Sequence, residues 1–131
     1  MDIKSFMQEV VGEKKEVQLD RFSEPFIVEA ISETENDRLK KVHTTKRRSK
    51  SGNMVTDLDT DKYGDALLAR CIKQPDLQNA ELQAFYETEG DTSGTLKAML
   101  LAGEYANLTK EVLELNGFNE KEEEIKDEVK N

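Results

Sequence analysis

Residues 95–118 read TLKAMLLAGEYANLTKEVLELNGF and form the densest apolar stretch of a 131-residue chain. Apolar side chains recur in it every three or four residues, at Leu101, Tyr105, Leu108, Val112 and Leu115. That spacing is typical of one face of an amphipathic α-helix. Gly117 can take the left-handed conformation that ends a helix, with Phe118 folded back onto Leu113. We therefore predict a short helix, a joint at Gly103 and a longer final helix.

The region between Thr60 and this stretch is also predicted to be helical. Tyr63, Leu67 and Cys71 lie four residues apart, on one face of a first helix. Pro75 should end that helix, because the residue before a proline is pushed out of the helical region. Two further helices should follow, separated by Gly90. Their candidate N-cap residues are Asp76 or Asn79 for the first and Thr92 or Ser93 for the second.

The N-terminus predicts a short helix from Asp2 to Val11, with Asp2 as its N-cap. Its apolar side chains fall on one side at helical spacing: Ile3, Phe6, Met7, Val10 and Val11. A helix of this length is marginal in isolation, so we expect it to dock on another surface.

Residues 16–19 and 26–31 are predicted strands, and together they would form a hairpin. Ser32 followed by Glu35 is a capping box, which predicts a helix to about Val42. Residues 44–57 are interpreted as a loop with some strand content, and an exposed hairpin is the alternative.

These patterns predict an α+β fold that is predominantly helical. A small N-terminal β-hairpin or sheet should precede a C-terminal bundle of about four helices. The length allows one domain, which we assign to residues 1–118, mixed over 1–58 and helical over 59–118. Residues 119–131 hold six acids and three lysines and are predicted to form a flexible tail.

The composition disfavours several classes of function. The net charge of −9 argues against general binding to nucleic acid or anionic membranes. A single cysteine rules out an internal disulfide, and no apolar run approaches the ~20 residues of a membrane span. The N-terminus lacks the basic start and apolar core of a secretory signal. We therefore expect a cytoplasmic protein.

No pattern predicts a catalytic residue, a cofactor or a metal site. His43, the only histidine, is interpreted as a surface residue, and Cys71 as a core residue on an apolar helix face. One histidine and one cysteine cannot provide a zinc framework. Residues 57–61 contain three alternating aspartates, but the Gly and Glu of a calcium loop are absent. The chain is therefore not expected to be an enzyme.

Seven of the 19 basic residues lie within residues 38–50, with no acid among them: Arg38, Lys40, Lys41, Lys46, Arg47, Arg48 and Lys50. Removing seven positive charges from a net charge of −9 leaves −16 on the other residues. Such a segment is typical of a solvated surface, of a docking site for an acidic partner or of a phosphate contact. It can also meet the acidic tail of another copy.

Short motifs follow one another in a definite order over residues 26–118. They are Ile31-Ser32-Glu33 with Glu35-Asn36, Lys50-Ser51-Gly52, Asp61 with Tyr63 and Leu67, Pro75-Asp76-Leu77 with Ala80-Glu81-Leu82-Gln83, Met99-Leu100-Leu101, Gly103-Glu104-Tyr105 and Asn116-Gly117-Phe118. In this order they resemble the XkdN-like family of tail assembly chaperones, found in phages and defective prophages of Gram-positive bacteria. Ala102 departs from the family pattern, in which a proline precedes Gly103, and leaves the joint less rigid.

The resemblance implies a non-enzymatic chaperone that binds the tape measure protein while tail-tube subunits polymerise around it. It implies no cofactor and no place in the finished virion. The tail-tube protein and further copies of this chain are additional candidate partners, whereas nucleic acid and membranes are not expected. The alternative hypothesis is a small nucleic-acid-binding or regulatory protein that uses residues 38–50.

A tape measure protein exposes long amphipathic helices, so its chaperone needs an apolar groove in which a helix can lie. The candidate partner-binding residues are Leu101, Tyr105, Leu108 and Val112 on the apolar stripe and Arg38, Lys46, Arg47 and Arg48 in the basic segment. The same apolar positions can instead form the core of the domain itself.

Overall fold

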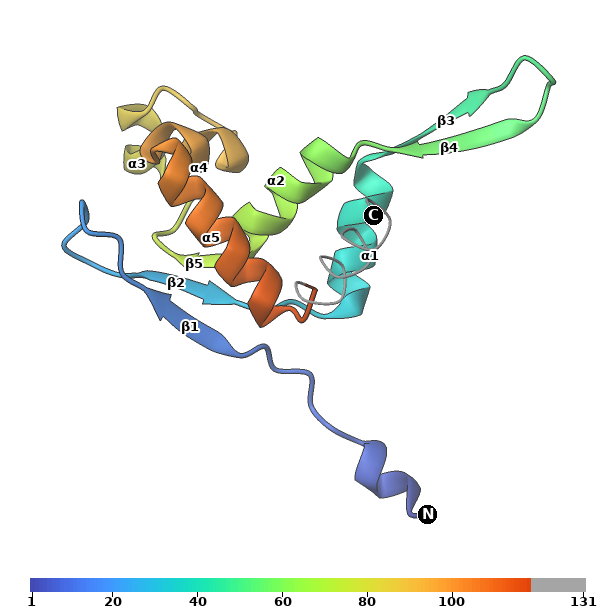
Figure 1. Ribbon diagram of the computed structural model, residues 1–131, viewed down its shortest axis with the longest axis horizontal. Helices are drawn as coiled ribbons and strands as arrows, with labels where there is room; N and C mark the ends of the chain where they lie inside the picture. Colours follow the sequence, from blue (N-terminus) through green and yellow to red (C-terminus); the bar gives the residue numbers. More distant parts are fainter. Residues whose placement is uncertain (119–131) are drawn as a thin grey trace, which may run out of the picture.

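The computed structural model describes residues 1–118, and it confirms the predicted α+β class (Figure 1). The strands are β1 (Lys14–Val17), β2 (Phe26–Glu29), β3 (Thr44–Arg48), β4 (Met54–Leu58) and β5 (Ile72–Gln74). The helices are α1 (Glu33–Val42), α2 (Thr60–Cys71), α3 (Ala80–Phe85), α4 (Thr92–Met99) and α5 (Ala102–Leu115), preceded by a 3-10 turn η1 (Ile3–Phe6). The tail predicted at 119–131 lies outside the described residues.

A three-stranded antiparallel sheet with the order β1-β2-β5 underlies the helical half. β1 and β2 form the predicted hairpin, in which Val17 lies opposite Phe26. The sequence did not predict β5. The chain leaves α2 after Cys71 because Ile72 pairs with Val28 of β2 and is buried there. Pro75 therefore follows a strand, and the prediction that it ends a helix is wrong.

The core lies between this sheet and the helices (Figure 1). α5 packs against β1 and β2, while α2 contacts α1, α4, α5 and β5. The buried apolar residues form a single cluster: Val17, Leu19, Phe26, Val28, Leu67, Leu68, Cys71, Ile72, Leu77, Leu96, Met99, Leu108 and Val112. Burial of each large side chain of this cluster stabilises the fold by about 2 kcal/mol before the entropic cost of folding.

The C-terminus of α5 has the predicted stop. Gly117 has a φ of +80°, and its N–H donates to the carbonyl of Glu114 at 3.0 Å. The N–H of Phe118 donates to the carbonyl of Leu113 at 2.9 Å. These two bonds are typical of a helix that ends at a left-handed residue. They turn the chain so that Phe118 packs against the core.

The joint before α5 differs from the prediction. It lies at Leu100 and Leu101, which are both extended, whereas Gly103 belongs to the first turn of the helix. The cause is Glu104, whose carboxylate accepts the N–H of Leu101 at 2.8 Å and so caps the helix. Arg21 clamps this carboxylate through Nε and Nη2, at 2.9 and 2.6 Å. These two partners, Arg21 above all, hold the pKa of Glu104 below its ordinary value.

Side-chain caps begin the other helices. Ser32 caps α1 as predicted, and of the two candidates for α3 it is Asn79 that accepts the N–H of Leu82, at 3.0 Å. For α4 the prediction of Thr92 or Ser93 is wrong. Asp91 caps this helix, because its carboxylate accepts the N–H of Gly94 at 2.9 Å and favours the positive end of the helix dipole.

The N-terminal arm, residues 1–12, extends away from the body of the molecule (Figure 1). The helix predicted from Asp2 to Val11 is wrong, because only the turn η1 forms. Asp2 does act as its cap and accepts the N–H of Lys4 at 3.0 Å. A longer helix lacks support here, since the arm buries none of the side chains of η1 against the domain.

Residues 44–58 form a complete hairpin, so our preference for a loop at 44–57 is wrong. β3 and β4 pair antiparallel from Thr44 opposite Leu58 to Arg48 opposite Met54. Their turn closes through the N–H of Ser49 and the carbonyl of Asn53 (2.8 Å). Figure 1 shows this hairpin projecting from the ends of α1 and α2.

Candidate functional site

The predicted partner-binding stripe on α5 divides into buried and accessible parts. Leu108 and Val112 are 0% and 1% exposed and belong to the core. Tyr105 is half-buried, and Leu101 is 61% exposed just before the helix begins. In this conformation a partner can therefore contact Leu101 and Tyr105, while Leu108 serves the interior of the domain.

Tyr105 lies at a groove between α2 and α5 with a volume of about 260 Å³. Its apolar residues come from both helices: Leu67, Leu68, Val112 and Leu113. Polar residues accompany them, among them Asp61, Asp65 and Thr109. Gly64 also lines the groove, and a Cβ placed on it would meet no atom within 4 Å. The groove thus combines an apolar surface, polar groups and one position without a side chain, where a helix backbone can approach closely.

A polar network fixes one wall of this groove. The hydroxyl of Tyr105 donates to Oδ1 of Asp65, and Nζ of Lys97 donates to Oδ2, both at 2.6 Å. Burial alone would raise the pKa of Asp65, but the hydrogen bonds from Lys97 and Tyr105 outweigh it and hold that pKa below its ordinary value. Burial, together with the Asp65 carboxylate, raises the pKa of the Tyr105 hydroxyl. The network joins α2, α4 and α5, and it holds the Tyr105 side chain in place at the groove.

The N-terminal arm presents a second apolar surface. Its side chains at helical spacing are between 60% and 78% exposed: Ile3, Phe6, Met7, Val10 and Val11. The sequence indicated an apolar face that needs a docking surface, and within residues 1–118 no such surface covers it. The arm is therefore available to another molecule.

The basic segment is spread over α1 and the projecting hairpin. Arg38 is exposed on α1, whereas Lys46, Arg47 and Arg48 are exposed on β3. Alternation along the strand places Lys46 and Arg48 on one face of the hairpin and Arg47 on the other. Arg47 pairs with Asp57 at 2.5 Å. The structure thus brings Lys46 and Arg48 together and separates them from Arg47.

The remaining polar candidates have structural roles. The backbone of His43 ends α1 and accepts the N–H of Asp59 at 2.9 Å. Cys71 is buried, and burial raises the pKa of its thiol. Asp59 caps α2 through the N–H of Lys62 at 3.1 Å. Among residues 1–118 no group of His, Cys, Asp and Glu side chains could hold a metal ion.

Known proteins match this chain over most of its length. Residues 3–130 match the model of a family described as "Phage XkdN-like tail assembly chaperone protein". The chain belongs to the XkdN-like family of phage tail assembly chaperones. The phage-like element PBSX protein XkdN of Bacillus subtilis (strain 168) is 30% identical over 107 residues, which span 82% of this chain and 72% of that protein.

A second relative has a solved structure. The uncharacterized protein YqbN of Bacillus subtilis (strain 168) is also 30% identical over 107 residues, with the same coverage of both chains. The crystal structure of the protein YqbN matches this chain with a TM-score of 0.74 and 29% identity. The match covers 91% of this chain and 98% of that one.

Family membership confirms the resemblance drawn from the ordered motifs and places the role of the chain in phage tail assembly, with partners among the phage tail proteins. The described part of the chain contains no helix long and apolar enough to span a bilayer. Sequence reasoning expected an apolar groove among the helices from Tyr63 to Gly117 but did not place it between α2 and α5, because its position depends on how two helices lie against each other. Gly64 was its one signal, as a glycine inside a predicted helix.

Proposed function

We propose that this chain binds the tape measure protein during phage or prophage tail assembly and carries out no catalysis. It acts in the cytoplasm of the bacterial host and is absent from the finished virion. The observation that carries the proposal is the open groove between α2 and α5, in a member of the tail assembly chaperone family.

The groove fits a helical client in its chemistry. An amphipathic helix places apolar side chains every three or four residues along one face, and such helices bind in apolar grooves. A client helix laid between α2 and α5 would cover the half-buried side chains of Tyr105 and Leu113 and pass close to the backbone at Gly64. Asp61 and Thr109, which line the same groove, can meet the polar side of the client. Leu101 is exposed at the start of α5 but does not line the groove, so it would be a separate apolar contact.

The N-terminal arm supports the same role. Its five exposed apolar residues have the spacing of one helix face, but the arm is helical only from Ile3 to Phe6. A segment of this kind can complete its helix when a partner covers the apolar face, and the ordering cost then moderates the affinity. The arm can therefore act as a second contact for a long client.

The charge of the chain suits repeated binding along such a client. A net charge of −9 on 131 residues keeps copies soluble when many of them are held close together. The acids also disfavour non-specific binding to nucleic acid, so client choice can rest on apolar contact.

Co-expression with the tape measure protein of the same phage or prophage tests the proposal. We expect the client to become soluble and to co-purify with this chain. The variant Phe6→Ser/Val10→Ser should capture less client, whereas Val42→Ser, which changes an exposed apolar residue outside the arm and the groove, should capture as much as the native chain. A client that stays insoluble and unbound would contradict the proposal.

A further inference from the structure

The N-terminal arm joins the domain at a glycine. Gly12 is half-buried, whereas residues 1–11 and 13–16 are exposed. A Cβ placed on Gly12 would overlap the carbonyl oxygen of Ala30 and lie 2.9 Å from its carbonyl carbon. Only glycine, which has no Cβ, therefore allows the chain to lie this close to Ala30.

The backbone of Ala30 is held in place from two sides. Its N–H donates to the carbonyl of Glu13 at 3.0 Å, one residue beyond the pairing of β1 with β2. The N–H of Ile31, which shares a peptide plane with the Ala30 carbonyl, donates to Oδ1 of Asn116 at 3.0 Å. Asn116 is itself fixed, because its Nδ2 donates to the carbonyl of Val112 at 2.8 Å. A side chain at residue 12 would therefore displace the exposed arm rather than this carbonyl.

The same contacts place the root of the arm beside the groove between α2 and α5. Lys15 of β1 forms an ion pair with Glu111 of α5, and Glu111 adjoins Val112, which lines the groove. Asn116, which holds the peptide in contact with the arm, is the C-cap of α5. The arm thus leaves the domain near the end of α5, which forms one wall of the groove, and it then extends away from the body (Figure 1).

We propose that Gly12 is a positioning residue for client binding, because its contact with Ala30 fixes the direction in which the arm leaves the sheet. A client helix that lies in the groove and passes the end of α5 then meets the exposed apolar side chains of the arm, among them Phe6 and Val10. An arm that starts in a fixed direction loses less freedom when it contacts the client.

The inference rests on the proposed binding of the tape measure protein and adds that the arm needs a fixed direction as well as an apolar face. The continuity of the arm with the groove favours the client as the molecule that covers it. The charges of the arm are mixed, with Asp2, Lys4 and Glu9, so it lacks the basic face with which amphipathic helices bind anionic membranes.

Titration calorimetry of the full chain with a soluble helical segment of the tape measure protein tests the inference. Gly12→Ala should raise the dissociation constant by about tenfold, as should Phe6→Ser/Val10→Ser, which removes the apolar face of the arm. Gly103→Ala is the matched control, because a Cβ there meets no atom within 4 Å, and it should bind as the native chain does. Urea unfolding of each variant checks that the domain stays folded.

Combining the two changes separates positioning of the arm from a general structural effect. If Gly12 acts through the arm, Gly12→Ala/Phe6→Ser/Val10→Ser should bind about as weakly as either parent variant. Two independent effects would instead multiply to a loss of about a hundredfold.

An insertion variant keeps the test decisive if Gly12→Ala does not fold. Four glycine and serine residues inserted between Val11 and Gly12 leave the contact with Ala30 intact but free the direction of the arm. We expect this variant to keep the native urea midpoint and to bind the client segment about as weakly as Phe6→Ser/Val10→Ser.

Three results would overturn the inference and leave the proposed function standing. Native affinity of the insertion variant, or of a folded Gly12→Ala variant, would show that the direction of the arm does not matter. A hundredfold loss in the combined variant would show that Gly12 acts apart from the arm. Dimers of the native chain that sedimentation velocity detects without client, and that Phe6→Ser/Val10→Ser abolishes, would assign the arm to a second copy. A native chain that binds no client segment would overturn the inference and the proposed function together.

Discussion

Leu101 and Leu108 are identical residues on one predicted stripe, and the structure gives them different surroundings. Leu108 has no exposed surface and belongs to the core, whereas Leu101 lies largely in solvent. The fold therefore depends on the first of these residues far more than on the second.

The variant Leu108→Ala should lower the free energy of unfolding by about 2–5 kcal/mol, because it leaves a cavity in the core. Leu101→Ala should change it by less than about 0.5 kcal/mol, because its side chain buries little. Urea unfolding followed by circular dichroism measures both. Equal costs for the two variants would contradict the assignment of Leu108 to the core.

Asp65 makes stability depend on pH. Its folded-state pKa is held below the ordinary value of 3.8, so the stabilisation from Lys97 and Tyr105 is complete above that value and is lost as pH falls through the folded pKa. Asp65→Asn should cost about 1–3 kcal/mol at neutral pH and progressively less as the medium becomes more acidic than pH 3.8.

Thermal unfolding at pH 7 and at pH 3 measures this difference for Asp65→Asn. Asp20→Asn is the matched control, because Asp20 is an exposed acid without an ion pair in residues 1–118. If Asp65→Asn lowers stability by the same amount at both pH values, the carboxylate charge is not what stabilises the network.

At the scale of elements, the sequence predicted what local chemistry determines and missed what tertiary contacts determine. The Ser32 cap and the stop at Gly117 depend on neighbouring residues, and both predictions were right. β5 has three residues, and its pairing partner Val28 lies far away in the sequence, so no local pattern marks it. The hairpin at 44–58 lacks an apolar face. Its strands therefore do not show the alternation of apolar and polar residues that predicts a half-buried strand.

The N-terminal arm differs from its prediction in a way that can be tested. Its apolar spacing predicted a docked helix, but residues 1–11 are exposed. Deletion of residues 1–11 should therefore change the free energy of unfolding by less than about 0.5 kcal/mol, while it weakens client capture. A large loss of stability, measured by urea unfolding, would mean that the arm packs against the domain.

The residue that follows the end of α5, Gly117, allows a test of local backbone conformation. Gly117→Ala should cost about 1 kcal/mol, because alanine is strained at a φ of +80°. Gly103→Ala should be neutral or slightly stabilising, since Gly103 lies in a helix and a Cβ there meets no atom within 4 Å. The urea midpoints of unfolding measure both effects. If the midpoints of the two variants shift by the same amount in the same direction, the left-handed conformation of Gly117 at the end of α5 is contradicted.

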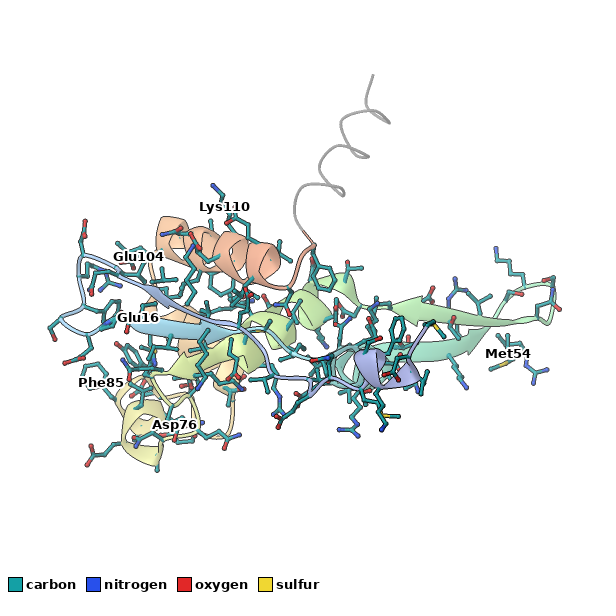
Figure 2. All side chains as sticks on the ribbon, turned by 90° about the horizontal axis from the view of Figure 1, so that it is seen from below. Glu16, Met54, Asp76, Phe85, Glu104 and Lys110 are labelled. Atoms are coloured by element: carbon teal, nitrogen blue, oxygen red, sulfur yellow. The ribbon has the colours of Figure 1, made fainter. Side chains whose placement is uncertain are left out.

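At the scale of the whole molecule, the groove lies between α2 and α5, and the apolar N-terminal arm extends from the body (Figure 1). The basic hairpin with Met54 and the acidic region with Phe85, residues 76–91, lie at opposite ends (Figure 2). The order of motifs along the sequence was enough to predict the family, and apolar spacing with capping signals was enough to predict the α+β class. The position of the groove and the separation of charge could not be predicted, because both depend on which distant segments the fold brings together. Binding of Arg38, Lys46, Arg47 and Arg48 to a partner remains a prediction.

The central claim is that a client helix binds in the groove between α2 and α5, and Gly64 allows a direct measurement. A Cβ at Gly64 meets no atom within 4 Å, so Gly64→Leu places a side chain in the groove, and Gly103→Leu adds the same side chain at an exposed helical position that does not line it. Titration calorimetry with soluble helical segments of the tape measure protein measures the affinity of each variant. We predict that Gly64→Leu lowers the affinity by more than about tenfold, or ~1.4 kcal/mol, while Gly103→Leu binds as the native chain does. Native affinity in a folded Gly64→Leu variant would contradict the claim.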